Sequence, residues 1–455
     1  MAPEMRQVVP LPWPGSWLAR SRRDPLGWVL EGMRVYGDVF RIRLGPMVFH
    51  LVAHPDHVRR VLLDNARNYP RSRFYDRTRI VLGEGLVTTE GAAWRRLRRM
   101  SQPAFHHERI AELAVAMTDA IAAMLDRWRA HARDAPDEPL DVVAEFAGLT
   151  LRIAGRALMG IDLIDEADRI TRSVTTALDF LEHRINDLPS WPAFLPTPRN
   201  LRARRALRDF DEMIAEILAG RRVGSGRDAG DLLAMLLAVR DEETGGGLSD
   251  RELRDQILTF IGAGHETTAV ALAWTISLLC RHPEAADRLR DEVDAALGGR
   301  TPAADDLPRL SYTRRVIEES LRLYPPVYAT LRDAVADDEI GSYHIPARSM
   351  VILCPYVTHR HPDFWPDAEA FDPDRFLPER SGDRPRFAWY PFLGGPHQCI
   401  GQEFALMEMV LALAMIARAF RFDLAAGARV EPRAMFTLRP RDGVPVILRP
   451  RDRED

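Results

Sequence analysis

The chain has 455 residues, of which 46% are hydrophobic and 28% are charged, and its formal net charge is -4. This length and balance are typical of a soluble globular protein that buries a large core. A nearly neutral charge argues against a nucleic-acid binder, because affinity for a duplex needs many cations gathered on one face.

Three cysteines occur, and they form no CxxC pair and no metal-finger spacing. The sequence therefore indicates neither a disulfide framework nor a zinc site, and it favours a reducing cytoplasm. The N-terminal stretch lacks the apolar core of a signal peptide. The longest uncharged run, 267–280, is shorter than the roughly 20 residues that a membrane span needs. We therefore expect a cytoplasmic monomer with no membrane span.

Prolines interrupt residues 1–25, which predicts an irregular lead-in, and residues 26–455 are expected to form one domain. VFRIRL and MVFHLV flank Gly45-Pro46 and predict a β-hairpin from their alternation. Helical periodicity follows. The predicted helices are 57–65, 108–130, 141–159, 165–182, 201–218, 249–280, 283–297, 313–324 and 400–419.

The stretch FLGGPHQCIG, residues 392–401, places Cys399 in a glycine-lined loop before the last predicted helix. Its glycines permit close approach of the backbone to a large flat group, or a turn in which a side chain would clash. Amides at the start of the following helix favour a thiolate. Taken alone, the pattern fits an inert core cysteine better, because a single cysteine in an apolar setting usually packs.

The longest predicted helix contains FIGAGHETTAVALAW, residues 260–274. Each of its two glycines weakens a helix by about 1 kcal/mol relative to alanine. Glu266, Thr267 and Thr268 add polar groups to an otherwise apolar face. By itself, a glycine-mediated helix contact with threonines bonded to the preceding turn is the favoured interpretation.

In VIEESLRLYPP, residues 316–326, Glu319 and Arg322 share one helix face at i,i+3 spacing. Such pairs are usually weak surface pairs. FDPDRF, residues 371–376, offers Arg375 as a third partner. A buried carboxylate between two guanidinium groups would be a structural device rather than a catalytic one.

WRRLRRMSQPAF, residues 94–105, places Trp94 and Arg98 one helical turn apart within an arginine cluster. Such a cluster is usually a solvated face. The indole N–H and the guanidinium can instead hold an anion together, such as a carboxylate of a bound cofactor.

Together these four stretches resemble the cytochrome P450 family of haem-thiolate monooxygenases. The motifs occur in the family's order, and the resemblance extends from PDHVRRVL near residue 55 to TLRPRDGVPVIL near the end of the chain. It implies a single-domain fold, mainly α with minor β, in which haem lies between a long central helix and a cysteine-ligand loop.

The resemblance implies haem b, iron protoporphyrin IX, as the cofactor and Cys399 as the axial thiolate ligand of the iron. The other residues implied near the haem are Phe392, Gly395 and Gly401 in the loop and Ala263 and Gly264 on the central helix. The residues implied to hold the propionates are Trp94, Arg98, Arg332 and His397. His397 departs from the arginine of most members, and its charge is less assured. Arg348 departs from a glycine that is common at a turn.

Glu266 and Thr267 match the family's acid–alcohol pair, which the resemblance implies relays protons during activation of O2. Glu319, Arg322 and Arg375 match its structural triad, whose loss is expected to prevent haem incorporation.

Family topology implies substrate contacts along the loop 74–87, the helix face 260–263 and the segments 327–331 and 435–437. The residues expected to contact substrate are Phe260, Val327, Ala329, Leu331, Phe436 and Thr437. Most of these are apolar, which predicts a lipophilic substrate such as a terpenoid, steroid or fatty acid, held by burial. Met47 and Leu51 replace the arginine and tyrosine of fatty-acid hydroxylases, which favours a neutral terpenoid or steroid.

The predicted function is hydroxylation or epoxidation with O2 and with electrons from a separate ferredoxin and ferredoxin reductase. Arg95, Arg96 and Arg99 are a candidate docking face for an acidic ferredoxin, although a solvated face explains them equally well. A peroxide-using fatty-acid peroxygenase ranks second, because such relatives usually replace the acid–threonine pair. A non-catalytic haem sensor or electron carrier is the third interpretation, and it needs neither that pair nor an apolar pocket.

Overall fold

The structure of the protein, a computed structural model, describes residues 24–44, 47–160, 194–223, 231–241 and 245–451, together with 173, 176, 177, 179–181 and 243. The predicted lead-in up to residue 23, the turn at 45–46 and most of the predicted helix 165–182 lie outside the described residues. The chain separates into two compact units. We call them the sheet unit (Met1–Tyr75, Glu318–Cys399 and Pro432–Arg439) and the helical unit (Asp76–Ile317, Ile400–Glu431 and Pro440–Asp455).

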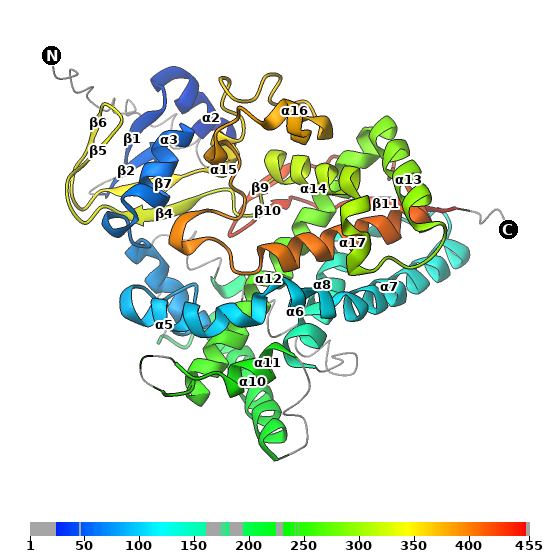
Figure 1. Ribbon diagram of the computed structural model, residues 1–455, viewed down its shortest axis with the longest axis horizontal. Helices are drawn as coiled ribbons and strands as arrows, with labels where there is room; N and C mark the ends of the chain where they lie inside the picture. The colour runs from blue at the N-terminus through cyan, green and yellow to red at the C-terminus, as the bar shows by residue number, and fades with distance from the viewer. Residues whose placement is uncertain are drawn as a thin grey trace. The chain divides into compact units, whose positions relative to one another are not determined.

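The sheet unit contains a four-stranded sheet with the order β1-β2-β7-β4 (Figure 1). Its strands are β1 (Val39–Leu44), β2 (Met47–Val52), β4 (Thr330–Asp333) and β7 (Met350–Leu353). β1 and β2 pair antiparallel, which confirms the predicted hairpin. β2 pairs parallel with β7, and β7 pairs antiparallel with β4.

Alternation along β1 and β2 sends side chains into two different cores. Val39 and Val52 are fully buried on one face, together with Val351 of β7. Phe40 and Leu51 are buried on the other face. Both faces of this part of the sheet are therefore covered, which gives the hairpin a fixed register.

Helix α2 (Pro25–Tyr36) was not predicted and packs against the sheet. Its start carries the usual signals, because Asp24 accepts a hydrogen bond from the Gly27 N–H at 2.9 Å and proline occupies the first turn. Gly32 allows the Phe40 ring to lie where a side chain would begin. The contact with Phe40, which the sequence does not reveal, offsets the low helix propensity of its glycines.

Short elements make up most of the remaining sheet unit. They are α3 (Pro55–Arg59), the π-helical turn η1 (Arg60–Asp64), β5 (Asp338–Ile340), β6 (Tyr343–Ile345), α15 (Pro355–Thr358), η7 (Pro373–Phe376), α16 (Pro378–Ser381), η8 (Arg386–Ala388), η9 (Gly395–His397), β9 (Pro432–Ala434) and β10 (Leu438–Pro440). β7 pairs with β2, which is distant in sequence, whereas β5 and β6 are three-residue strands that pair with each other; none of β4 to β10 was predicted.

The helical unit contains most of the long helices. Its helices are α4 (Arg79–Leu82), α5 (Gly91–Ser101), α6 (His107–Glu112), α7 (Ala114–Asp134), α8 (Val142–Met159), α10 (Pro198–Val223), α11 (Leu232–Ala238), α12 (Asp250–Arg281), α13 (Pro283–Leu297) and α17 (Gln402–Ala419), and α14 (Ser311–Leu323) begins in this unit. A small sheet joins β3 (Leu140–Asp141), β11 (Pro445–Pro450) and β8 (Phe420–Leu424). The predicted helix 283–297 coincides with α13, whereas the predicted helix 108–130 is interrupted at Leu113 between α6 and α7.

The central helix α12 packs along α8 (Figure 1). Ser249 begins it with a capping box, in which the Ser249 N–H donates to Glu252 at 2.8 Å and the Glu252 N–H donates back to the Ser249 hydroxyl at 3.3 Å. Thr150 of α8 is within hydrogen-bond distance of the His265 carbonyl, at 2.8 Å. This contact supports α12 directly before its acid–threonine pair.

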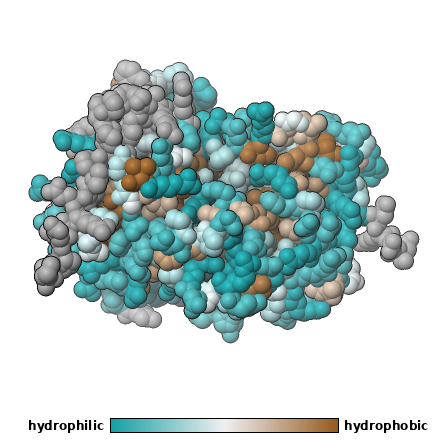
Figure 2. All heavy atoms as spheres, turned by 90° about the horizontal axis from the view of Figure 1, so that it is seen from above, coloured by the Kyte–Doolittle hydropathy of each residue, from teal (hydrophilic) through white to brown (hydrophobic). Residues whose placement is uncertain are grey.

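No helix in the described part of the chain is long and apolar enough to cross a membrane. Figure 2 shows one face that is mostly hydrophilic, with hydrophobic side chains in small separate patches. Single exposed apolar residues of this kind are normal on a protein surface.

The turn before β7 keeps an unusual backbone at Arg348. Its φ is +65°, a left-handed conformation that glycine adopts without strain. Ser349 N–H donates to the Pro346 carbonyl at 3.2 Å to close the turn, and Arg348 N–H donates to the Ala334 carbonyl at 2.7 Å. Arg348 therefore adopts the left-handed backbone conformation that the family's glycine would favour at this turn.

We expect Arg348→Gly to raise the free energy of unfolding by about 0.5–1 kcal/mol, because relief of left-handed strain outweighs the extra chain entropy of glycine. Thermal unfolding of the haem-loaded protein measures this change. The matched control is Ala347→Gly, since Ala347 does not have a positive φ and should only lose stability. A loss of stability in Arg348→Gly would show that the arginine side chain contributes more than its backbone costs.

Candidate functional site

The three cysteines lie in different environments. Cys354 is buried, its thiol donates to the Tyr328 carbonyl at 3.1 Å, and burial raises its pKa to about 12. Burial also raises the pKa of Cys280 to about 12. Cys399 is exposed. Since a thiolate is the form that binds metals, the raised pKa values disfavour Cys280 and Cys354 as ligands, and the role of Cys399 as the iron ligand stays a prediction.

The loop before Cys399 is shaped by contacts within the protein. Cys399 N–H donates to the Phe392 carbonyl at 2.9 Å. Gly395 has a φ of +67°, and a Cβ at this position would lie 1.8 Å from the Leu62 carbonyl oxygen in η1. A Cβ at Gly394 would lie 2.4 Å from the Phe387 ring. Of the two explanations for these glycines, a turn in which a side chain would clash accounts for both.

The central helix has one open window. From Asp255 to Leu279, every residue of α12 is buried except Gly262, Ala263, Gly264 and Thr267. A Cβ added to Gly264 would meet no described atom within 4 Å. Because spacings of three and four residues share one face, the window is a continuous strip of small residues with one hydroxyl.

Glu266 and Thr267, the acid–alcohol pair, differ in exposure. Thr267 lines the window, and its hydroxyl donates to the Ala263 carbonyl at 2.7 Å. This is the threonine back-bond that the simpler interpretation predicted. The bond uses the one hydroxyl hydrogen and leaves the oxygen lone pairs able to accept a further hydrogen bond. Glu266 is buried beside it.

These features fit haem. An exposed thiol in a fixed loop is a suitable donor to iron, and a strip of small residues on α12 admits a large flat group. Two of the residues expected to hold propionates, Trp94 and Arg98, lie on α5 and are buried and half-buried. Arg332 is buried in β4, and His397 is half-buried in η9. The roles of these four residues stay predictions.

The arginine cluster of α5 is used partly inside the helical unit. Arg96 forms ion pairs with Glu252 and with Asp241, the latter at 3.3 Å. Arg99 pairs with Asp241 at 3.2 Å and with a second acid at 3.1 Å. Arg95 is exposed. Two of the three arginines therefore form ion pairs with carboxylates of this same chain. Neither of the two interpretations given above, a docking face and a solvated face, predicted these pairs.

Two of the segments expected to contact substrate are joined in the sheet unit. Leu438 N–H donates to the Pro326 carbonyl at 2.9 Å, which places 436–437 beside the segment that begins at Val327. The expected contact residues Val327, Ala329, Leu331 and Phe436 are half-buried, whereas Thr437 is buried. Phe260 is buried in α12 and packs on Phe105, with ring centroids 5.3 Å apart.

The predicted structural triad is assembled in full. Glu319 and Arg322 have no exposed side-chain surface and form two parallel hydrogen bonds of 2.7 and 2.8 Å. Arg375 Nε lies 3.4 Å from Glu319. The remaining guanidinium N–H groups donate to backbone carbonyls, those of Arg322 at His359, Ala368 and Ala370 and those of Arg375 at Pro366 and Asp367.

A buried histidine connects this triad to the cysteine loop. His359 Nδ1 lies 3.3 Å from the Arg322 carbonyl, and its Nε2 accepts the Tyr390 N–H at 2.9 Å. Burial and the neighbouring Arg322 lower the pKa of His359 well below its usual value, so the ring is neutral. A neutral ring that donates from Nδ1 and accepts at Nε2 satisfies both contacts. Tyr390 then accepts from the Leu393 N–H at 2.9 Å, inside the loop.

We expect Glu319→Gln to destabilise the protein by about 3–5 kcal/mol, because it leaves buried Arg322 and Arg375 without a carboxylate. The ratio of haem to protein and the unfolding free energy measure the effect, and both should fall. The control is Glu112→Gln, in the exposed i,i+3 pair with Arg109, where the change should stay within about 0.5 kcal/mol. Normal haem loading in the Glu319→Gln variant would show that the triad is not needed to hold the cysteine loop in place.

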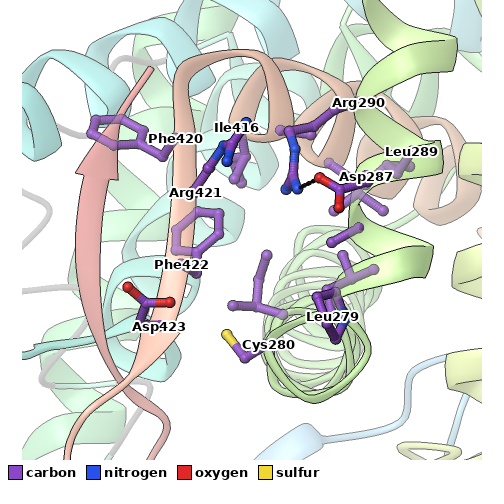
Figure 3. Close-up of a pocket in the computed structure, with 15 residues that line it drawn as sticks. Leu279, Cys280, Asp287, Leu289, Arg290, Ile416, Phe420, Arg421, Phe422 and Asp423 are labelled. Atoms are coloured by element: carbon purple, nitrogen blue, oxygen red, sulfur yellow. Dashed lines mark hydrogen bonds and ion pairs between the residues drawn. The ribbon is translucent and has the colours of Figure 1, made fainter. Parts of the chain in front are cut away.

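A cavity of about 220 Å³ lies apart from the predicted site residues, between α12, α13, α17 and β8 (Figure 3). Cys280 and Asp423 line it, and Asp287 and Arg290 of α13 form an ion pair at its wall. The negative charge of Asp423 adds to the effect of burial in raising the pKa of Cys280. We assign no role to this cavity.

The family comparison agrees with the geometry. The family model for cytochrome P450 matches residues 5–444. Cyclooctatin synthase of Streptomyces melanosporofaciens is 39% identical over 94% of this chain and 92% of its own length. Cyclooctat-9-en-7-ol 5-monooxygenase of the same organism is 40% identical over 90% and 88%. Pentalenene oxygenase of Streptomyces avermitilis is 37% identical over 91% of each chain.

A solved structure has the same fold. The crystal structure of the cytochrome P450DA heme domain superposes with a TM-score of 0.89 at 26% identity and covers 98% of both chains. This similarity confirms the predicted fold class, mainly helical with small sheets.

Proposed function

Because the chain belongs to the cytochrome P450 family, we propose that it oxygenates a terpenoid hydrocarbon or alcohol. Family membership makes it a haem-dependent monooxygenase. The observation that carries the substrate class is the identity of 37–40%, over about nine tenths of the chain, with oxygenases named for cyclooctatin, cyclooctat-9-en-7-ol and pentalenene.

The proposed contact residues suit such a substrate. Val327, Ala329 and Leu331 are half-buried and carry no ionisable group. A terpenoid with at most one hydroxyl would be held mainly by burial of its apolar surface, which contributes about 25 cal/mol per Å². Burial alone orients a molecule weakly, so the shape of the pocket would decide which carbon is oxidised.

We assign to Cys399 the thiolate that would hold the haem iron, and to Glu266 and Thr267 the proton relay. When bound, haem supplies the activation of O2, and a thiolate ligand favours cleavage of the O–O bond. Thr267 holds its hydroxyl hydrogen on the Ala263 carbonyl and offers its oxygen lone pairs towards the window of α12. A proton supplied from the Glu266 carboxyl would pass through Thr267 only if Oγ1 accepts it while releasing the hydrogen that it now donates to Ala263.

Electrons would come from a ferredoxin with its reductase, in the cytoplasm. Arg95 supports this proposal, because it is exposed on α5 while its neighbours Arg96 and Arg99 are ion-paired. Contacts of a single exposed cation with an acidic partner affect the association rate more than the affinity. Arg95→Gln should therefore slow the first electron transfer chiefly at low salt.

Titration of the ferric, haem-loaded protein with terpenoids, fatty acids and steroids tests the substrate class. We expect a blue shift of the Soret band with terpenoids, because a substrate that fills the pocket displaces water from the iron. Product analysis with O2 and a surrogate electron donor then checks turnover. A shift with fatty acids alone would contradict the proposal, and a shift with steroids alone would move the substrate to that class.

Thr267→Ala is expected to keep haem and substrate binding but to divert NAD(P)H consumption from product to hydrogen peroxide. Loss of a relay hydroxyl should lower product per NAD(P)H about 10²-fold, within the range for general acid–base groups. Thr275→Ala is the matched control, because Thr275 makes the same back-bond to Ala271 at 2.8 Å on the same helix. Equal coupling in the two variants would exclude Thr267 from the relay.

A further inference from the structure

The loop that ends at Cys399 contains a strained backbone conformation. Leu393 has a φ of +59°, in the left-handed region that residues with a Cβ rarely adopt. Two residues later, Gly395 also has a positive φ, which glycine adopts without strain. Strain of this kind persists only where the surrounding structure holds the backbone in place. The neighbours of this loop in the sheet unit therefore determine whether it keeps its conformation.

The turn η1 supplies two contacts to the strained loop. The Leu393 side chain packs against a buried cluster that includes Val61 and Leu62 of η1. The Gly395 backbone lies so close to η1 that a Cβ at this glycine would be 1.8 Å from the Leu62 carbonyl oxygen. Because one contact is made by a side chain and the other by the backbone, the position of η1 sets the position of the loop.

A carboxylate from a distant strand holds η1. Asp338 of β5 accepts a hydrogen bond from Arg60 Nη2 at 2.7 Å and another from the Tyr69 hydroxyl at 2.8 Å. Arg60 is the first residue of η1, and Tyr69 follows the 3-10 turn η2 (Ala66–Asn68) that comes after it. Asp338 therefore binds the segment that contains η1 at both of its ends. A π-helical turn such as η1 is rare and often occurs near a functional site.

Asp338 is charged although only 7% of its side chain is exposed. Burial opposes the charge, but the hydrogen bonds from Arg60 and Tyr69 outweigh this effect, so the pKa of Asp338 lies below its usual value. Hydrogen bonds to a charged group are roughly twice as strong as those between neutral groups. The charge of Asp338 thus fixes the segment 60–69 more firmly than a neutral side chain of the same shape would.

We propose that Asp338 is a positioning residue for the sulfur of Cys399. Asp338 holds η1, and η1 holds the strained loop that leads to the sulfur. The proposal rests on the assignment of Cys399 as the thiolate that would hold the haem iron. Groups outside the ligand set orient a ligand and tune its bond to the metal. When the support from Asp338 is lost, Leu393 can relax to an unstrained backbone, and the loop then holds the sulfur less firmly.

The test follows the thiolate signature of the haem-loaded protein. The protein is reduced and treated with CO, and the Soret band that marks a thiolate ligand is followed during mild warming. The rate at which this band is lost measures how firmly the loop holds the sulfur. We expect Asp338→Asn to raise this rate about tenfold, because one charged hydrogen bond becomes a neutral one. Tyr69→Phe removes only the 2.8 Å contact and should raise the rate about threefold.

Asp306→Asn is the matched control. The Asp306 side chain is 6% exposed and forms a bidentate ion pair with Arg300, as Asp338 does with Arg60. It lies in η6 (Ala304–Arg309) of the helical unit, outside the cysteine loop. Each variant is measured at the same interval below its own midpoint of thermal unfolding, so that a general loss of stability does not contribute. Asp306→Asn should then keep the wild-type rate.

Leu393→Asn tests the part that strain plays. Asparagine adopts the left-handed conformation more readily than leucine, because its short side chain can hydrogen-bond locally. Added to Asp338→Asn, this substitution should lower the rate towards that of the wild type, since an unstrained loop needs less support. The loss of Leu393 packing lowers overall stability, which the matched temperatures take into account.

Three results would overturn the proposal: a wild-type rate in both Asp338→Asn and Tyr69→Phe, equal rates in Asp338→Asn and Asp306→Asn, or no rescue by Leu393→Asn. If Asp338→Asn does not bind haem, the rate in Tyr69→Phe decides. A wild-type protein without the thiolate band would overturn the assignment of Cys399 as well. With a normal wild-type band, failure concerns Asp338 alone, and the terpenoid proposal is read separately from the ferric protein and from products.

Discussion

Glu319 of α14 lies between Arg322 and Arg375 with none of its side chain exposed, and the segment 359–372 packed against this triad contains no helix or strand. A buried carboxylate is costly unless its charge and its lone pairs are satisfied. Here two guanidinium groups and the Asp372 N–H satisfy it. The same guanidinium groups also bind five backbone carbonyls between His359 and Ala370, so the triad ties this segment of turns to α14.

The cysteine loop depends on this arrangement through His359. The ring lies against Arg322 on one side and the Tyr390 N–H on the other, and it is neutral because burial and Arg322 disfavour its charge. Tyr390 leads directly into the loop that ends at Cys399. Removal of the Glu319 charge would therefore disturb the cysteine loop through a chain of hydrogen bonds, although Glu319 itself lies outside that loop.

The central helix solves a different problem. Twenty-one of the residues between Asp255 and Leu279 are buried, so α12 is a core helix that must still present reactive groups. Small residues open one strip of its surface, and Thr267 is the one polar side chain in that strip. Glu266 is buried next to it, and Thr150 of α8 supports the backbone at His265. Glycine lowers the stability of this helix, and in return it leaves the strip around Thr267 open to a bound molecule.

Local signals were enough for much of the fold. The predicted helices 249–280 and 283–297 and the hairpin at β1 and β2 each have a nearest-neighbour cause, since a capping box begins α12 and a proline begins α13. Helix α2 was missed although Asp24 and Pro25 mark its start, because its glycines lower the helical signal and its stability comes from packing on Phe40. Strand β7 was missed because its partner β2 is distant in sequence, and β5 and β6 were missed because each has only three residues.

The sequence by itself determined the family, the candidate ligand Cys399 and the members of the Glu319 triad, because these depend on residue types at fixed spacings. Only the tertiary structure decided that Gly395 is required by the Leu62 carbonyl, that Arg96 and Arg99 are used by internal carboxylates, and that Asp338 binds Arg60 and Tyr69. The physical reason is distance along the chain. A pattern records what neighbouring residues favour, whereas a charge, a clash or a cavity depends on atoms that meet only after folding.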